Sequence, residues 1–316
     1  MIQVKASLKD TPIIGSLLNL TKTNSQASSL LQFLDILSSK SLHATLSLTA
    51  ARGRGKSALL GLSIAASISY GYSNVFLTSP SPENLGTVWE FLFKGFDALG
   101  YQEHLDYDLI QSLTDKSILR VNVFRDHRQT IQYIHPADSH LLSSAELVVV
   151  DEAAAIPLPL VKKLLGNYLV MLSSTINGYE GTGRSLSLKL LKELRENSAG
   201  YNAQTAKPAD STARTGGRQL KEVQLTTPIR YNPNDPVEAW LNSVLCLDCC
   251  DDAVNSKAVS ALQYALPHPS QCELFYINRD TLFSYHPVSE AFLRKIMALY
   301  VGSHYKNSPN DLMLMR

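Results

Sequence analysis

A glycine-rich segment at residues 50–57 constrains the fold of this chain more than any other stretch. It reads Ala-Ala-Arg-Gly-Arg-Gly-Lys-Ser, follows the apolar run at 46–50 and precedes a helical pattern at 57–69. A strand, a glycine-rich loop ending in Gly-Lys-Ser and a helix, in this order, are typical of the phosphate loop of nucleoside triphosphatases. A surface turn of the same composition is the alternative, and the strand and helix on either side favour the phosphate loop.

Each residue type in this segment has a physical task. Gly53 and Gly55 let the backbone curl so that successive N–H groups point at phosphate oxygens, and the next helix adds the partial positive charge of its N-terminus. Lys56 is then expected to reach the β- and γ-phosphates, and the Ser57 hydroxyl to bind Mg²⁺. Ala50 stands where the general pattern has glycine, so the chain must enter the loop without a positive φ angle there.

Length and composition are those expected of a soluble globular protein. The 316 residues are enough for roughly two domains, and 45% of them are hydrophobic. The formal net charge is +1, so no overall basic field points to nucleic acid, and any such surface must be local. We find no apolar run long enough to span a membrane and no secretory leader, so the cytosol or the nucleus is expected.

The four cysteines fall late in the chain, at Cys246, Cys249, Cys250 and Cys272. This distribution argues against a disulfide framework and is typical of a reducing compartment. A single C-x-x-C spacing without a second pair or a nearby His pair is weak support for zinc, so packing at a helix end is the favoured interpretation.

Strand-like and helix-like segments alternate along most of the chain. The expected strands lie at 12–20, 46–50, 74–79, 147–150, 168–174 and 221–226, with alternating segments at 118–124 and 130–135 as further candidates. The expected helices lie at 24–38, 57–69, 84–99, 160–165, 186–195 and 237–245. This order predicts a three-layer RecA-like α/β fold with a mostly parallel sheet, which binds its ligand at the carboxyl ends of the strands.

The second strong motif is an apolar strand that ends in two carboxylates. The run at 147–150 is followed directly by Asp151 and Glu152, at the expected nucleotide edge of the sheet. Asp151 is expected to hold Mg²⁺, mostly through water, and Glu152 to orient or deprotonate the attacking water. A strand that merely ends in solvent is the alternative, and a phosphate loop roughly 95 residues upstream disfavours it.

Two further polar residues follow expected strands. Ser174 ends the strand at 168–174, where ATPases of this kind place a hydroxyl that senses the γ-phosphate. Arg230 comes soon after the strand at 221–226, a position from which it can fork onto nucleotide phosphates. A surface salt bridge is the alternative role for Arg230 when the residue is taken alone.

Three loops are candidates for contact with nucleic acid. The loop at 78–84 is rich in hydroxyls and prolines, the turn at 125–129 is basic, and the loop at 176–185 carries three glycines. Each has an ordinary alternative: a helix N-cap for the first, a water-exposed hairpin tip for the second, and a turn before the next helix for the third.

The last third of the chain is expected to divide into smaller parts. Residues 198–217 are polar and poor in large apolar side chains, which predicts a disordered insertion. Residues 273–277 and 281–285 are predicted to form a hairpin before a helix at 289–305. The predicted boundaries are a β-α lead-in at 1–40, an ATPase domain at 41–245, a linker at 246–272 and a partial α+β segment at 273–316.

Five stretches together carry a specific resemblance. They are the phosphate loop at 49–57, the loop at 78–84, the acidic strand end at 150–157, the hydroxyl and glycine loop at 174–184, and the segment at 298–312. On these motifs the chain resembles the helicase-type ATPase module of the eukaryotic RNA cytidine acetyltransferases over almost its whole length. That family shares the alanine at the first loop position, which accounts for Ala50.

The resemblance implies ATP and Mg²⁺ as ligands and further residues at their site. ATP contacts are implied for Arg52, Gly53, Arg54, Gly55, Lys56, Ser57, Ala58, Leu59, Leu60, Gly61 and Arg230. Members of the family are nucleolar enzymes that use ATP and acetyl-CoA to form N4-acetylcytidine in small-subunit ribosomal RNA and, with an adaptor protein, in some transfer RNAs. The resemblance implies no membrane partner and leaves room for a homo-oligomer formed outside this chain.

The resemblance also implies an acetyltransferase domain that begins near Glu273 and is cut short at Arg316. The Gly-rich acetyl-CoA loop of the family has no counterpart between these residues, so we expect no acetylation by the chain as it stands. One RecA-like lobe of roughly 150 to 200 residues fits here, which favours slow ATP hydrolysis that positions RNA over processive unwinding. A non-hydrolysing, ATP-dependent RNA-binding switch and a ribosome-assembly scaffold with a vestigial loop are the alternatives.

Overall fold

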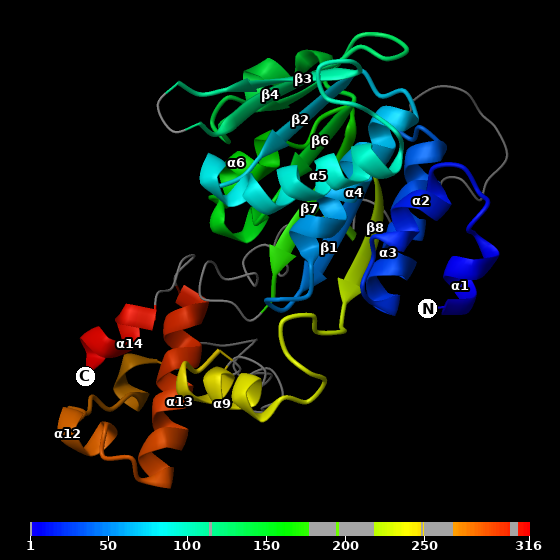
Figure 1. The fold of residues 1–316 in the computed structure, drawn as a ribbon. Helices are drawn as coiled ribbons and strands as arrows, with labels where there is room; N and C mark the ends of the chain where they lie inside the picture. Colours follow the sequence, from blue (N-terminus) through cyan, green and yellow to red (C-terminus); the bar gives the residue numbers. More distant parts are fainter. Residues whose placement is uncertain are drawn as a thin grey trace, which may run out of the picture. The chain divides into compact units, whose positions relative to one another are not determined.

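The computed structural model describes residues 2–113, 116–176, 194–195, 218–247, 249, 268–303 and 309–316. The chain divides into two compact units. The first unit comprises Met1–Ile176 and Gly183–Pro233, and the second comprises Asn177–Thr182 and Asn234–Arg316. In Figure 1 the first unit is a sheet flanked by helices, and the described part of the second unit is a small group of helices.

An eight-stranded sheet forms the centre of the first unit. Its strands are β1 (Ala44–Ala50), β2 (Asn74–Thr78), β3 (Tyr107–Gln111), β4 (Ile118–Val123), β5 (Gln129–Tyr133), β6 (Leu147–Val150), β7 (Leu169–Thr175) and β8 (Gln219–Leu225). Their spatial order is β3-β4-β5-β2-β6-β7-β1-β8. The pairs from β5 to β8 are parallel, whereas β4 runs antiparallel to both of its neighbours. The mostly parallel α/β sheet predicted from the sequence is therefore confirmed.

Helices cover both faces of this sheet. The longer ones lie against one face, where Figure 1 shows α4 and α5. The helices of this face are α2 (Ile14–Asn19), α3 (Asn24–Ser38), α4 (Lys56–Ser69) and α5 (Gly86–Ala98), and α6 (Leu158–Lys163) packs on the other face. Shorter elements are α1 (Ile2–Ser7) and the 3₁₀ turns η1 (Pro82–Leu85), η2 (Ser139–Ser144) and η3 (Ala153–Ala155).

Alternate residues of β2, β6 and β7 enter two separate cores, because successive side chains of a strand point to opposite faces. In β7, Met171 joins the core formed with α3, α4 and α5, whereas Val170 and Leu172 join the core formed with α6. The same alternation decides which hydroxyls at the end of β7 face the phosphate loop.

The predicted strand at 12–20 is wrong, and with it the β-α form of the lead-in. This segment contains helix α2, which buries Leu17 and Leu18 in the core shared with α3. Together with Ile14, these residues have the i, i+3, i+4 spacing of a helical face, which the two-residue period of a strand does not explain. The predicted helix at 24–38 is confirmed as α3, with Thr23 as its N-cap.

The second unit has a small apolar core of its own. Its described elements are α9 (Pro236–Val244), η5 (Pro269–Gln271), α12 (Arg279–Leu282), α13 (Pro287–Ser303) and α14 (Pro309–Met315). Cys246 and Cys249 are buried in this core beside Leu293 and Met297. The predicted hairpin around 278–280 is wrong, because the Asn278 side chain accepts a hydrogen bond from the Thr281 N–H and begins helix α12 instead.

Several predictions fall on residues that the structure does not describe. The helix at 186–195, apart from its last two residues, and the insertion at 198–217 lie outside the described ranges, as does most of the loop at 176–185 and of the linker at 246–272. Among the described residues, no helix is long and apolar enough to cross a membrane.

Candidate nucleotide-binding site

The loop between β1 and α4 has the curled backbone that its two glycines predict. Gly53 and Gly55 both have left-handed φ angles, 71° and 82°. Residues with a Cβ atom rarely adopt this conformation, so the curl depends on glycine at both positions. Gly55 is also the residue that caps α4, whose first residue is Lys56.

The segment after β8 holds this loop. The N–H groups of Ile229 and Arg230 donate to the Gly53 carbonyl, at 2.9 and 3.2 Å. A Cβ atom at Gly53 would lie 2.7 Å from Cβ of Arg230, so the two backbones are in close contact. The structure thus brings Arg230 to the phosphate loop, although it follows the end of β8 by several residues rather than ending the strand.

The other loop cations contact the loop's own backbone. The Lys56 ammonium lies 3.4 Å from the Ala50 carbonyl and is buried, and the Arg54 guanidinium donates to the Arg52 carbonyl at 3.0 Å. Lys56, at the end of the loop, thus reaches back to the carbonyl of Ala50 at its start.

Asp151 connects the acid pair to the phosphate loop. Its carboxylate accepts a hydrogen bond from the Ser57 hydroxyl at 2.8 Å and another from the Ser173 hydroxyl at 2.8 Å. Ser57 lies in the first turn of α4, Ser173 belongs to β7, and Asp151 follows β6, so three elements meet at one carboxylate. The predicted meeting of Ser57 with Asp151 is present in the geometry.

Glu152 is held by the end of the neighbouring strand. Its two carboxylate oxygens accept hydrogen bonds from the Thr175 N–H at 3.0 Å and the Thr175 hydroxyl at 2.6 Å. Glu152 itself has a left-handed φ of 49°, which turns its side chain out of the line of β6. Thr175 pairs in register with Ala50, so the Glu152 carboxylate lies beside the entry to the phosphate loop.

Ser174 faces the other layer. It stands one residue from both Ser173 and Thr175, so strand alternation turns its hydroxyl to the side of the core formed with α6. The hydroxyls of Ser174 and Thr78 are buried and have no hydrogen-bond partner among the described residues. The structure does not bring Ser174 to the acid pair, and its role as a phosphate sensor stays a prediction.

The remaining implied contacts lie inside α4. Leu59 and Leu60 are fully buried in the core, and a Cβ atom at Gly61 would meet the Val88 carbonyl of α5 at 2.4 Å. These side chains therefore pack against the sheet and α5, while Ala58 also lies buried within α4. ATP contacts from 58–61 stay a prediction of the resemblance.

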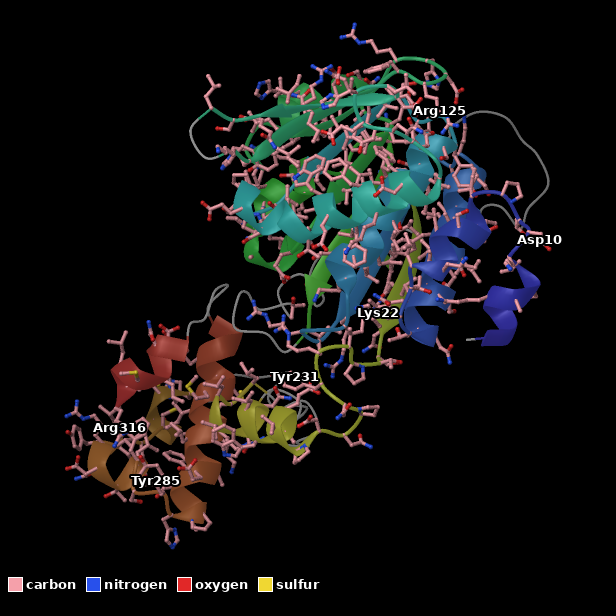
Figure 2. The ribbon with its side chains drawn as sticks, viewed as in Figure 1. Asp10, Lys22, Arg125, Tyr231, Tyr285 and Arg316 are labelled. Atoms are coloured by element: carbon pink, nitrogen blue, oxygen red, sulfur yellow. The ribbon has the colours of Figure 1, made fainter. Side chains whose placement is uncertain are left out.

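The candidate loops for nucleic acid lie at different edges of the sheet. The turn at 125–128 precedes β5, which is parallel to β2, so it lies where the parallel strands begin. Figure 2 shows Arg125 at the opposite edge of the first unit from Lys22 and Tyr231, which flank the phosphate loop. The loop at 78–84 follows β2 and so lies at the phosphate-loop edge, where Ser81 and Pro82 begin η1.

The residues present fit a magnesium nucleotide. The centre offers hydroxyl and carboxylate oxygens from Ser57 and Asp151, which are the ligands that Mg²⁺ prefers. The loop beside them has two left-handed glycines at a helix N-terminus, a combination that favours bound phosphate.

Comparison with known proteins identifies the family. Residues 47–248 match the family described as RNA cytidine acetyltransferase NAT10/TcmA, helicase domain. The chain belongs to this family. The RNA cytidine acetyltransferase of Saccharomyces cerevisiae is 61% identical over 99% of the chain, and that of Homo sapiens is 59% identical over 99%. The chain spans 30% of the length of each of these relatives.

The chain also matches a second family near its C-terminus and resembles two solved structures. Residues 295–316 match the family described as GNAT acetyltransferase 2. Among solved structures, the large terminase of a thermophilic bacteriophage superimposes with a TM-score of 0.44 at 12% identity, covering 68% of this chain and 49% of the terminase chain. The ATPase domain of a Thermus phage large terminase gives 0.39 at 11% identity, covering 78% and 93%.

Sequence reasoning missed Ser173, Thr175 and Gln26. The first two follow from strand alternation once Asp151 is placed beside β7, because residues two apart share a face. Gln26 donates to the Gly55 carbonyl at 3.3 Å from 29 positions upstream. No local sequence pattern indicates a contact of that kind.

Proposed function

We propose that the first unit binds ATP with Mg²⁺ and hydrolyses it slowly, as the ATPase module of an RNA cytidine acetyltransferase. The observation that carries this proposal is the 2.8 Å hydrogen bond between Ser57 and Asp151, which joins the phosphate loop to the acid pair. A phosphate loop and a strand-end carboxylate that share one ligand centre are the parts that P-loop ATPases use.

The chain's own residues have distinct roles in this proposal. Backbone N–H groups at 53–57 bind phosphate oxygens, and the Lys56 ammonium moves from the Ala50 carbonyl to the β- and γ-phosphates. Glu152, held by Thr175, orients the attacking water and accepts its proton. When bound by Ser57 and Asp151, Mg²⁺ supplies charge neutralisation of the phosphate oxygens. Arg230 forks onto the same phosphates.

The test measures binding of a fluorescent ATP analogue and ATP turnover for wild type, Lys56→Ala and Glu152→Gln. We expect Lys56→Ala to weaken binding by about tenfold or more, and Glu152→Gln to bind normally but lose turnover by about 100-fold or more. Glu146→Gln is the matched control, because Glu146 lies at the other end of β6 and accepts a hydrogen bond from the Ser73 N–H at 2.8 Å. A chain that does not bind the analogue would refute the proposal.

A non-hydrolysing switch is the second candidate. The buried position of Lys56 and the two bonds to Glu152 support binding as much as hydrolysis. The switch predicts that Glu152→Gln leaves RNA-linked function intact, whereas the ATPase predicts its loss. A scaffold with a vestigial loop predicts instead that Lys56→Ala leaves nucleotide affinity unchanged.

The rest of the proposal concerns a whole protein of the length of the relatives, of which this chain spans 30%. We propose that it forms N4-acetylcytidine in small-subunit ribosomal RNA and transfer RNA, uses acetyl-CoA through a GNAT-type domain beginning near Glu273, binds an adaptor protein for transfer RNA, and resides in the nucleolus. The relatives' names and the match at 295–316 support this. The test is N4-acetylcytidine in RNA from cells whose full-length protein carries Lys56→Ala, which should fall to background.

A further inference from the structure

Gln26 is a buried residue in the first turn of α3, and it is distant in sequence from the phosphate loop and the acid pair. Its side chain is 4% exposed. Its backbone N–H donates to the Thr23 hydroxyl at 3.2 Å, so the N-cap of α3 fixes where this residue stands. A buried amide must have its polar atoms paired, because an unpaired one costs roughly 1 to 3 kcal/mol.

Both ends of this amide are paired, and each end serves a different segment. Its carbonyl oxygen accepts a hydrogen bond from the Lys22 N–H at 3.0 Å. Its Nε2 donates to the Gly55 carbonyl at 3.3 Å. One rigid amide group therefore ties the turn before α3 to the phosphate loop. Figure 2 labels Lys22 at this edge of the first unit.

Gln26 and Ile229 approach Gly55 so closely that they leave no room for a side chain there. A Cβ atom at Gly55 would lie 2.2 Å from Nε2 of Gln26 and 2.9 Å from Cδ1 of Ile229. The glycine thus lies between Gln26 on one side and Ile229 on the other. Its positive φ and this close approach both require the absence of a side chain.

The orientation of the Gly55 carbonyl determines where the N–H of the next residue points. In a trans peptide, the carbonyl oxygen and the next N–H point in opposite directions. The next N–H belongs to Lys56, the first residue of α4. The carbonyl accepts from both Gln26 and the Leu59 N–H, the latter at 3.1 Å, so Gln26 adds a lateral restraint to the helical bond.

We propose that Gln26 is a positioning residue that holds the Gly55–Lys56 peptide with its N–H directed into the phosphate loop before nucleotide binds. The proposal rests on the proposed ATP-binding function and adds to it a restraint from outside the motif. Without Gln26, the loop must lose conformational freedom at the moment of binding, and affinity falls accordingly.

The experiment compares Gln26→Met with Gln129→Met in the 316-residue chain. Gln129 is a matched control, because it is also buried and its amide also bridges two backbone groups: Nε2 donates to the carbonyls of Ile68 and Tyr72, at 2.8 Å each. Ile68 lies in the last turn of α4 and Tyr72 lies between α4 and β2, away from the phosphate loop. Gln26→Glu is a second variant that can still accept from Lys22 but cannot donate to Gly55.

Two readouts separate positioning from general stability. Hydrogen exchange of a peptide covering 51–57, measured without nucleotide, should become at least about tenfold faster in both Gln26 variants and stay unchanged in Gln129→Met. Affinity for the fluorescent ATP analogue should fall about tenfold in the Gln26 variants, as expected for the loss of one hydrogen bond, and by less than about twofold in the control.

Three results would overturn the inference. Unchanged exchange at 51–57 in the Gln26 variants would show that Gln26 does not restrain the loop. Equal losses of affinity in Gln26→Met and Gln129→Met would show that both act through stability alone. If wild type does not bind the analogue, although exchange at 51–57 is faster in the Gln26 variants than in wild type, the proposed function is refuted and the restraint has no ligand.

Discussion

At the residue scale, three consecutive residues at the end of β7 have three different environments. The Ser173 hydroxyl binds Asp151, the Thr175 hydroxyl binds Glu152, and Ser174 faces the other layer. The extended backbone imposes this alternation, and the carboxylates take their hydrogen bonds from the face that also bears α4. Hydrogen bonds to a charged acceptor are stronger than neutral ones, so these two hydroxyls fix where the carboxylates point.

Replacing Thr175 by valine removes the 2.6 Å hydroxyl bond to Glu152 and keeps the branched shape and the 3.0 Å N–H bond. We expect kcat for ATP to fall about tenfold with little change in KM, because Glu152 acts on water rather than on ATP binding. Steady-state ATP turnover measures both constants.

Thr130→Val is the matched control for this substitution. Thr130 lies on β5, at the edge of the sheet where the parallel strands begin, and its hydroxyl donates to the Asn74 side chain at 3.5 Å. Its kcat should stay within about twofold of wild type. Equal losses in the two variants would mean that Thr175 acts through the sheet and not through Glu152.

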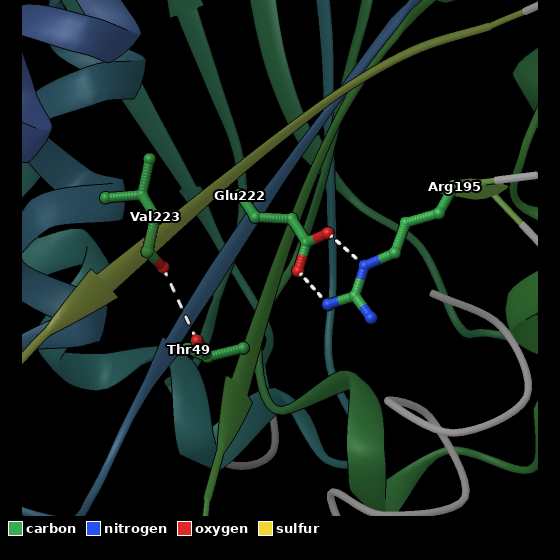
Figure 3. A network of polar contacts seen from close by, with 4 residues as sticks. All are labelled: Thr49, Arg195, Glu222 and Val223. Atoms are coloured by element: carbon green, nitrogen blue, oxygen red, sulfur yellow. Dashed lines mark hydrogen bonds and ion pairs between the residues drawn. The ribbon is translucent and has the colours of Figure 1, made fainter. Parts of the chain in front are cut away.

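Figure 3 shows two polar contacts of β8. The Thr49 hydroxyl donates to the Val223 carbonyl at 3.5 Å, and the exposed pair of Arg195 with Glu222 joins the described residues near Leu194 to β8.

The sequence predicts best those residues whose conformation is determined by their neighbours in a short motif. Gly53 and Gly55 allow the predicted curl, with left-handed φ angles of 71° and 82°, and Ser57 meets Asp151. Each belongs to a short motif in which neighbouring letters fix the conformation. Gln26 could not be found in this way, because its role arises only when α3 packs beside the phosphate loop.

At the element scale, α4 and α5 are in close contact at two glycines. A Cβ atom at Gly61 of α4 would lie 2.4 Å from the Val88 carbonyl of α5, and one at Gly95 would lie 2.6 Å from Cβ of Ala65. Glycine usually weakens a helix, so its presence inside both helices has a packing reason. The helix that follows the phosphate loop is thereby fixed against its neighbour.

Gly61→Ala should therefore destabilise the first unit, because the Val88 carbonyl is backbone and cannot move without shifting α5. We expect the free energy of unfolding to fall by about 1 to 3 kcal/mol, as for other overpacked sites. Gly86→Ala is the control: it lies at the start of α5 with open space around its Cβ position, and should stabilise by about 0.5 to 1 kcal/mol. Urea unfolding followed by circular dichroism measures both, and a stabilising Gly61→Ala would contradict the packing argument.

Long periodic elements could be predicted from the sequence and short ones could not. α3, α4 and the buried parallel strands carry enough apolar residues at one period to identify them. At 12–20 only six residues are helical, so the i, i+3, i+4 spacing of Ile14, Leu17 and Leu18 spans little more than one turn, and the prediction of a strand there was wrong. The hairpin around 278–280 failed because the capping preference of Asn278 outweighed two apolar runs.

At the scale of the whole molecule, the first unit buries titratable side chains on both faces of its sheet. Burial raises the pKa of five tyrosines above 10.0, namely Tyr70, Tyr72, Tyr107, Tyr133 and Tyr168. Burial lowers the pKa of Arg218 to about 10, because the charged guanidinium is removed from water, although it still donates to the carbonyls of Ala44, Gly166 and Tyr168. These two effects act on stability in opposite directions at alkaline pH.

Tyr72 makes the alkaline prediction specific. Burial, and then the negative charge of Glu146, raise its pKa to about 12, and its hydroxyl donates to the Leu37 carbonyl at 3.2 Å. A pKa raised by folding means that the unfolded chain releases this proton first, so the contribution to stability is complete below pH 10.0 and is lost as the pH rises toward 12. Arg218 opposes this in the same range, because its lowered pKa means that the folded chain releases that proton before the unfolded chain does.

Tyr72 should therefore make the free energy of unfolding of the first unit decrease between pH 10.0 and about pH 12, with a slope of up to about 1.4 kcal/mol per pH unit. Tyr72→Phe should reduce that slope, since phenylalanine has no proton to release, while lowering stability at neutral pH by about 1 kcal/mol through the lost bond to Leu37. Urea unfolding at a series of pH values measures both effects. A slope that is the same in Tyr72→Phe and wild type would mean that the Tyr72 phenol titrates alike in the folded and unfolded chain, and that its burial beside Glu146 has no energetic consequence.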